Sequence, residues 1–178
     1  MDLAAHFLAT SLDRFGGLKS TADAAIAQLE DAQLHEVPFE DGNSIVVLMK
    51  HMAGNMRSRW TDFLTTDGEK PDRHRDAEFV DDLESRKDLD ALWEGGWETL
   101  LGAIRALDEE DVTKTIYIRK EPHSVVEAIQ RQIAHYGYHV GQIVQVARAL
   151  KGADWVSISI PRGASGSYNE TMGHPTDS

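Results

Sequence analysis

Cysteine is absent from this chain of 178 residues. Its absence excludes disulfide bonds, thiolate ligands for a metal ion and a cysteine nucleophile. Long hydrophobic runs are also missing, because no apolar stretch approaches the roughly 18 residues that suggest a membrane-spanning helix. The first six residues lack the basic segment and apolar block that are typical of a secretory signal. We therefore expect a cytoplasmic protein with no membrane partner.

Basic residues are scarce, with 18 Lys and Arg against 30 Asp and Glu, which gives a formal net charge of −12. A chain with this balance repels phosphate backbones unless it concentrates its basic residues locally. The densest basic stretch, residues 70–75, is interrupted by Asp72. We therefore expect no nucleic-acid partner. The length predicts one domain over residues 1–178, with a mobile tail at 169–178.

The spacing of apolar residues predicts four long helices. The first covers about residues 3–30, the second about 43–63, the third begins after Ser85, and the fourth runs from Ser124 to a stop at Gly152. The fourth has the best start signal, since Ser124-Val125-Val126-Glu127 is a capping box. Alternating β-branched residues predict short extended segments near 113–119 and 155–160. Together these patterns predict an all-α fold, a four-helix bundle.

His135 and His139 are four residues apart in the fourth predicted helix, so their side chains share one face. A helical wheel puts both on the stripe that also carries Ile143 and Val146 and faces the core. Two imidazoles on one face can bind a single transition metal ion. The alternative is a packed pair of neutral histidines that form hydrogen bonds. We favour the metal site, because burying two imidazoles without good partners is unfavourable.

His51 in the second predicted helix is the third candidate ligand. Three imidazoles and a water form the open arrangement of a catalytic zinc site, and they also suit nickel, copper or iron(II). Asn55, Asp62 and Tyr136 are candidate catalytic residues that would orient a substrate or transfer a proton. The alternatives are a solvated helix edge for Asp62 and core packing for Tyr136.

Three blocks of the sequence resemble a known superfamily. They are residues 51–71, HMAGNMRSRWTDFLTTDGEKP, residues 135–143, HYGYHVGQI, and residues 155–169. These blocks resemble the DinB/YfiT-like superfamily of metal-binding four-helix bundles, and most closely an uncharacterised DinB-like branch, a domain of unknown function. The resemblance covers most of the chain after about residue 40.

The resemblance implies that His51, His135 and His139 bind one divalent metal ion, zinc or nickel. Some relatives in the superfamily are thiol-S-transferases that use bacillithiol or mycothiol, and others are thiol-dependent isomerases or hydrolase-like proteins. Members are commonly homodimers. Certain relatives have a carboxylate among the three ligands, whereas this chain has histidine at all three positions.

These observations lead to a hypothesis of a metal-dependent enzyme, thiol-S-transferase-like or hydrolytic, that activates a metal-bound thiol or water. Its partner would be a small-molecule substrate such as a low-molecular-weight thiol, which must come from outside because the chain has no cysteine. One alternative is a non-catalytic metal-binding stress or structural protein. Another is a dimeric interaction module without a metal. The sequence names neither the physiological metal nor the substrate, and it leaves the role of loop 65–79 undefined.

Overall fold

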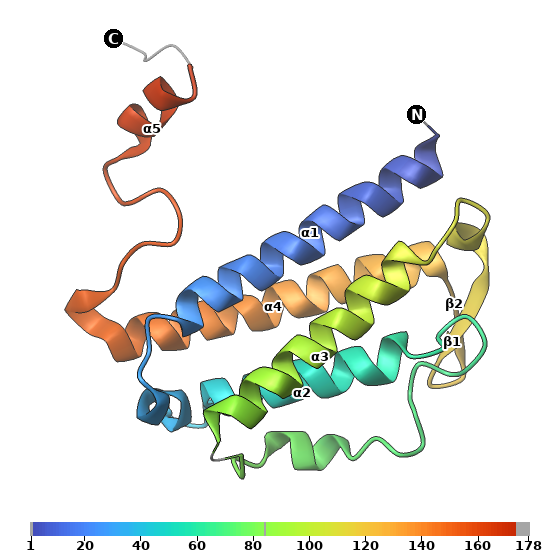
Figure 1. Cartoon of the computed structure of the whole chain (residues 1–178), viewed down its shortest axis with the longest axis horizontal. Helices are drawn as coiled ribbons and strands as arrows, with labels where there is room; N and C mark the ends of the chain where they lie inside the picture. Colours follow the sequence, from blue (N-terminus) through green and yellow to red (C-terminus); the bar gives the residue numbers. More distant parts are fainter. Residues whose placement is uncertain (1, 84, 174–178) are drawn as a thin grey trace.

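The computed structural model describes residues 2–83 and 85–173, and this part of the chain is mostly helical (Figure 1). Its α-helices are α1 (Leu3–Ile26), α2 (Ile45–Trp60), α3 (Arg86–Arg105), α4 (Val125–Lys151) and the short α5 (Ser165–Thr171). Its short 3₁₀ helices are η1 (Asp31–His35), η2 (Arg75–Phe79), η3 (Asp111–Thr113) and η4 (Gly152–Asp154). In the described ranges no helix has the length and apolarity needed to cross a membrane.

The helix boundaries follow from local capping chemistry. The Ser124 side chain accepts a hydrogen bond from the backbone N–H of Glu127, whose carboxylate accepts one in return from the N–H of Ser124. Ser85 caps α3 in the same way, by accepting from the N–H of Asp88. Gly152 ends α4 with a positive φ of 58°, which glycine adopts without steric cost. The predicted starts of α3 and α4 are confirmed, whereas α1 ends at Ile26, four residues before its predicted end.

The four long helices enclose one hydrophobic core. Helix α2 packs against α3 and α4, and α1 packs against α4 and α3. Phe15, Trp97 and Tyr136 are among the largest fully buried side chains of this core. Gly96 lets α2 and α3 approach closely, because a Cβ there would lie 2.8 Å from the Cα of Ala53. This packing fixes the position of α2 relative to α4, the two helices that carry the predicted metal ligands.

The segment near 113–119 contains a short strand, as predicted. Strand β1 (Thr115–Ile118) pairs in antiparallel register with β2 (Glu121–Ser124), a partner strand that was not predicted. Ile116 and Ile118 point into the core. The two-residue turn between the strands, Arg119 and Lys120, has positive φ at both positions.

The segment at 155–160, which was predicted to be extended, forms no hydrogen-bonded strand. Trp155 has extended backbone angles, and Trp155 and Ile158 pack onto the core. The side chain of Gln28 bonds both the backbone N–H and C=O of Val156, at 2.9 and 3.0 Å. The amide of Gln28, which follows α1, therefore forms with Val156 the hydrogen bonds that a neighbouring strand would otherwise form.

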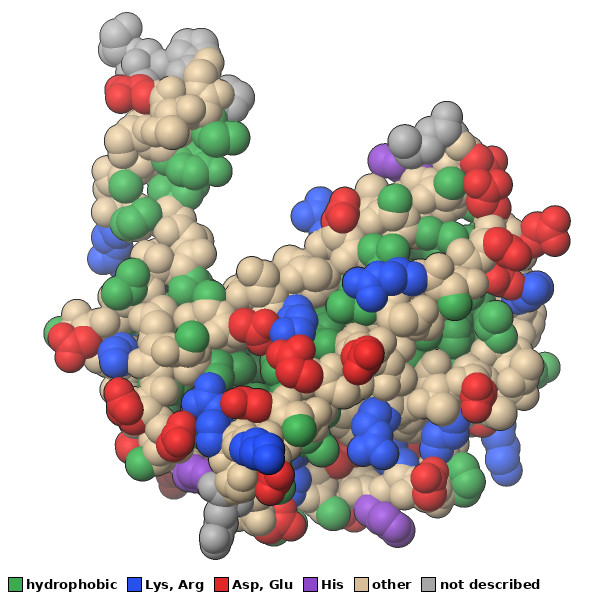
Figure 2. Space-filling view, viewed as in Figure 1, with side chains coloured by type: hydrophobic (Ala, Val, Ile, Leu, Met, Phe, Trp, Pro, Cys, Tyr) green, Lys and Arg blue, Asp and Glu red, His purple; other side chains and the backbone are tan. Residues whose placement is uncertain are grey.

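The tail contains a helix that the sequence did not predict. Residues 169–171 lie in α5, and residues 174–178, where a mobile tail was also predicted, lie outside the described residues. Figure 1 shows α5 well separated from the four long helices. Tyr168 and Met172 are exposed, and Figure 2 shows hydrophobic side chains gathered along this tail. Over the long helices the same view shows acidic and basic side chains mixed.

Candidate metal site

The fold brings the three predicted histidine ligands together. His51 comes from α2, and His135 and His139 come from α4. One ring nitrogen of each residue lies within 4.8 Å of those of the other two, so the three could hold a metal ion. The Nε2 atoms of His135 and His139 are 3.2 Å apart. The ring of His51 lies 4.8 Å from that of His139, between centroids, and 5.6 Å from that of His135.

Hydrogen bonds orient two of the three rings. The Nδ1 atom of His51 lies 2.9 Å from Oε2 of Glu78, and Nδ1 of His139 lies 2.7 Å from Oε1 of Gln142. Because a carboxylate and an amide oxygen only accept hydrogen bonds, each Nδ1 carries the proton. The neutral form of each ring then has its lone pair on Nε2, the atom left for a metal ion.

The pKa values of the two α4 histidines favour the neutral rings that bind metal ions. The pKa of His135 is lowered to about 3, mainly by burial and also by the proximity of His139 and His51. Burial also lowers the pKa of His139, although its hydrogen bond with Gln142 acts in the opposite direction. Both imidazoles are therefore uncharged near neutral pH, and no proton needs to leave before a metal ion binds.

The partner of His51 comes from η2, in the loop whose role the sequence left undefined. Glu78 is buried and accepts two hydrogen bonds of 2.8 Å from Arg73. Burial alone would raise the pKa of Glu78, but the bonds from His51 and Arg73 outweigh it and lower this pKa. Gly54 makes room for the carboxylate, because a Cβ there would lie 2.3 Å from Oε1 of Glu78. Phe79 covers the ring of His51, with 4.8 Å between centroids.

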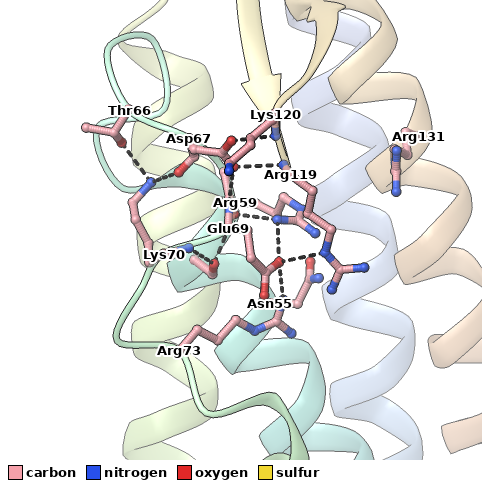
Figure 3. Close-up of polar contacts among 12 residues, drawn as sticks. Asn55, Arg59, Thr66, Asp67, Glu69, Lys70, Arg73, Arg119, Lys120 and Arg131 are labelled. Carbon is pink, nitrogen blue, oxygen red and sulfur yellow. Dashed lines mark hydrogen bonds and ion pairs between the residues drawn. The ribbon is translucent and has the colours of Figure 1, made fainter.

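A cavity of about 370 Å³ opens beside the three histidines. Its polar wall includes Asn43, Asn55, Gln132 and Gln142, and five arginines also line it: Arg59, Arg73, Arg75, Arg119 and Arg131. Figure 3 shows Arg59, Arg73 and Arg119 directed at Glu69, with Arg131 standing on a separate helix. The site therefore combines three imidazoles with a concentration of positive charge.

The three predicted catalytic residues lie in different places. Asn55 lines the cavity. Tyr136 is fully buried behind it, where its hydroxyl donates to Oδ1 of Asn55 at 3.0 Å and accepts from Nε1 of Trp60 at 3.2 Å. Burial raises the pKa of Tyr136, so the phenol stays protonated. Asp62 is exposed just beyond α2 and lines a different cavity, of about 640 Å³, together with Lys70. The structure thus brings Asn55 to the histidine cavity and leaves Asp62 outside it.

The supporting residues of the site were largely missed by sequence reasoning. Gln142 follows His139 by three residues, a spacing that puts both side chains on one helical face and could have identified it. Glu78 gives no such signal, because it is 27 residues from His51 and lies in an irregular loop. The arginines come from α2, the loop after it, the β1–β2 turn and α4, so only Arg73 and Arg75, in the basic stretch at 70–75, are close together in the sequence.

The family model for "Protein of unknown function (DUF1572)" matches residues 2–164. No curated protein and no solved structure matches the chain. Because the matched region covers most of the 178 residues, the chain belongs to the DUF1572 family of proteins of unknown function.

Proposed function

We propose that this protein is a metal-dependent enzyme, thiol-S-transferase-like or hydrolytic, with His51, His135 and His139 as the ligands. The observation that supports it is the meeting of three ring nitrogens within 4.8 Å, two of them 3.2 Å apart. A tetrahedral ion with bonds of about 2.0–2.1 Å separates its ligand nitrogens by roughly 3.3 Å, so the α4 pair fits without rearrangement. Zinc or nickel suits a set of three imidazoles.

The cavity favours a catalytic over a purely structural ion. Structural zinc sites are closed by four protein ligands, whereas catalytic sites have three and leave one position for a water or substrate. Here the described residues bring three histidines to the wall of a cavity of about 370 Å³, which is large enough for a small molecule. A bound ion would lower the pKa of a thiol or water in that cavity and so generate a nucleophile at neutral pH.

The chain itself supplies orientation and binding. Glu78 and Gln142 hold the rings of His51 and His139, and Asn55 offers an amide at the cavity wall. In the transferase reaction the sulfur of an external thiol forms a bond to an electrophilic carbon. The leaving group departs with its bonding electron pair, and the thiol proton goes to the leaving group or solvent. In the hydrolytic reaction a water oxygen takes the place of that sulfur.

The arrangement of helices supports membership of the DinB/YfiT-like superfamily as part of this proposal. Two of the ligands come from the last long helix and one from the second, as the resemblance implies. The proposal includes a four-helix bundle of DinB type, and a homodimer as in other members.

The test begins with the metal content of untagged protein, measured by elemental analysis. We expect about one zinc or nickel ion per chain, lost in the alanine variants of His51, His135 and His139. The variant His6→Ala is the matched control, since His6 is exposed, lies in α1 and does not line the cavity. Metal-loaded protein is then screened for turnover with thiols plus electrophiles, and separately with esters and amides.

Two outcomes would overturn the enzymatic proposal. Turnover that is unchanged when all three histidines are replaced by alanine would show that the reaction does not depend on a metal ion at this site. A metal-loaded protein without turnover, whose melting temperature falls strongly on chelation, would instead support a non-catalytic metal-binding protein.

A further inference from the structure

The histidine cavity is a basic region in an acidic protein. Five arginines line it, and no Asp or Glu is found among its described lining residues, although the net charge of the chain is −12. A cleft lined by one sign of charge raises the local concentration of ligands of the opposite sign. Three imidazole ligands for a metal cation do not need this positive charge, so the arginines require a separate explanation.

The two innermost arginines are already paired. The side chains of Arg59 and Arg73 are only 6% and 5% exposed, and Oε2 of Glu69 accepts from them at 3.0 and 3.3 Å. Arg73 also binds Glu78 through two bonds. The Nε atom of Arg59 is buried and has no hydrogen-bond partner among the residues that the structure describes. This inner network fixes the shape of the wall and leaves a donor unsatisfied there.

The outer arginines have unused hydrogen-bonding capacity. Arg119 is 54% exposed and reaches Glu69 only through Nε, at 3.3 Å. Arg131 is exposed, and its Nη1 atom lies 3.3 Å from Nε2 of His123. Arg75 lies over the ring of Phe79, at 4.8 Å from its centroid. Among the described contacts of Arg119 and Arg131, most guanidinium N–H groups have no protein acceptor.

The position of Arg119 is maintained against backbone strain. Arg119 and Lys120 have φ values of 55° and 66° in the hairpin turn, where Asn and Gly are the usual residues. The left-handed conformation is sterically unfavourable for each non-glycine residue. The carboxylate of Asp67 stabilises the turn by accepting from the N–H groups of both residues, at 2.8 and 2.7 Å (Figure 3). Backbone strain of this kind is found preferentially at functional sites.

We infer that the cavity binds a small organic anion, whose carboxylate or phosphate group contacts Arg119 and Arg131. Guanidinium groups bind both of these anions through paired, charge-assisted hydrogen bonds. One part of the inference rests on the proposed function: the reacting end of the bound anion lies at the three histidines. The anion-binding site itself does not depend on the metal.

The test compares two thiols that differ in charge. We expect 3-mercaptopropionate to bind metal-loaded protein about tenfold more tightly than 2-mercaptoethanol by calorimetry, since only 3-mercaptopropionate has a carboxylate that can accept charge-assisted hydrogen bonds from the arginines. Arg119→Gln and Arg131→Gln should each remove most of this preference. Metal content and melting temperature should stay at wild-type values. Arg148→Gln, an exposed arginine of α4 outside the cavity, is the control and should retain the preference.

A second titration uses metal-free protein with succinate and with inorganic phosphate, at low ionic strength. Binding that both arginine variants weaken would support the anion site even if no turnover were found, and the tighter probe would identify the preferred group. Equal affinities for the two thiols, or preferences that persist in both variants, would overturn the inference. Metal-dependent turnover of neutral thiols without any effect of Arg119 or Arg131 would overturn it and leave the proposed function standing.

Discussion

Oε2 of Glu78 lies 2.9 Å from Nδ1 of His51, and this contact connects a loop to the candidate metal site. His51 belongs to α2, whereas Glu78 belongs to η2, which follows an irregular segment. A carboxylate in this position fixes the tautomer and ring orientation of a ligating histidine and makes it a stronger donor. The geometry of the site therefore depends on a loop as well as on two helices.

The variant Glu78→Gln tests this dependence. We expect metal affinity to fall about 10- to 100-fold, because the amide lacks the charge that makes His51 a strong donor. The free energy of unfolding should fall by about 1–3 kcal/mol, since buried Arg73 loses one of its two ionic partners and keeps only Glu69. Metal titration and urea denaturation measure the two effects. Glu94→Gln is the control, because Glu94 is 62% exposed in its ion pair with Lys19 and should change stability by less than about 1 kcal/mol.

The depressed pKa of His135 predicts how the stability of the metal-free protein depends on pH. The pKa is about 3 in the folded state, against 6.5 for an unperturbed histidine. Between these values the unfolded chain binds a proton at this residue and the folded chain does not. The contribution of His135 to the free energy of unfolding is therefore fully present above pH 6.5 and is lost as the pH falls towards 3. The slope from this residue is at most about 1.4 kcal/mol per pH unit, and less because the ring is partly exposed.

Urea denaturation of His135→Gln across this range checks the prediction. The variant lacks the titrating ring, so its stability should decrease less steeply below pH 6.5 than that of the wild type. Parallel curves for the two proteins would show that His135 titrates alike in the folded and unfolded states.

The features that could be predicted from the sequence are those set by neighbouring residues. Capping at Ser85 and Ser124 depends on bonds to residues three positions away, and both helix starts are confirmed. The spacing of His135 and His139 likewise puts them on one face in any α-helix. The strand near 113–119 was visible in its own alternation, but its pairing with β2 was not, because Glu121-Pro122-His123-Ser124 has no such pattern.

The features that could not be predicted depend on contacts between distant segments. Glu78 reaches His51 across 27 residues, and nothing in its own surroundings in the sequence marks it as a partner. The segment at 155–160 alternates like a strand, but the backbone of Val156 is bonded by Gln28 instead. The arginines of the cavity come together only when α2, the β1–β2 turn and α4 are placed in space.

The variant Gly54→Ala tests the close approach of η2 to α2. In an open helical position Gly to Ala stabilises by about 1 kcal/mol. At Gly54 we expect the opposite sign, because the new Cβ would lie 2.3 Å from Oε1 of Glu78 and must displace that carboxylate from Arg73 and His51. Both the melting temperature and the metal affinity should fall.

Gly95→Ala provides the matched comparison for this substitution. Gly95 lies within α3, and a Cβ there would have no neighbouring atom within 4 Å. Its melting temperature should rise, with metal affinity unchanged. If both alanine variants were stabilised, η2 would not be held against α2 through Glu78 in solution.

The variant Tyr136→Phe separates packing from chemistry at the third candidate catalytic residue. Removing the hydroxyl leaves Oδ1 of Asn55 and Nε1 of Trp60 without their shared buried partner. Each unsatisfied group costs about 1–3 kcal/mol, so we expect a clear loss of unfolding free energy. Metal content should stay at the wild-type value, because the hydroxyl binds these two side chains and does not line the cavity. Tyr138→Phe, at an exposed position, should change stability by less than about 0.5 kcal/mol. A stable Tyr136→Phe protein that has lost turnover would instead assign the phenol a direct role in proton transfer.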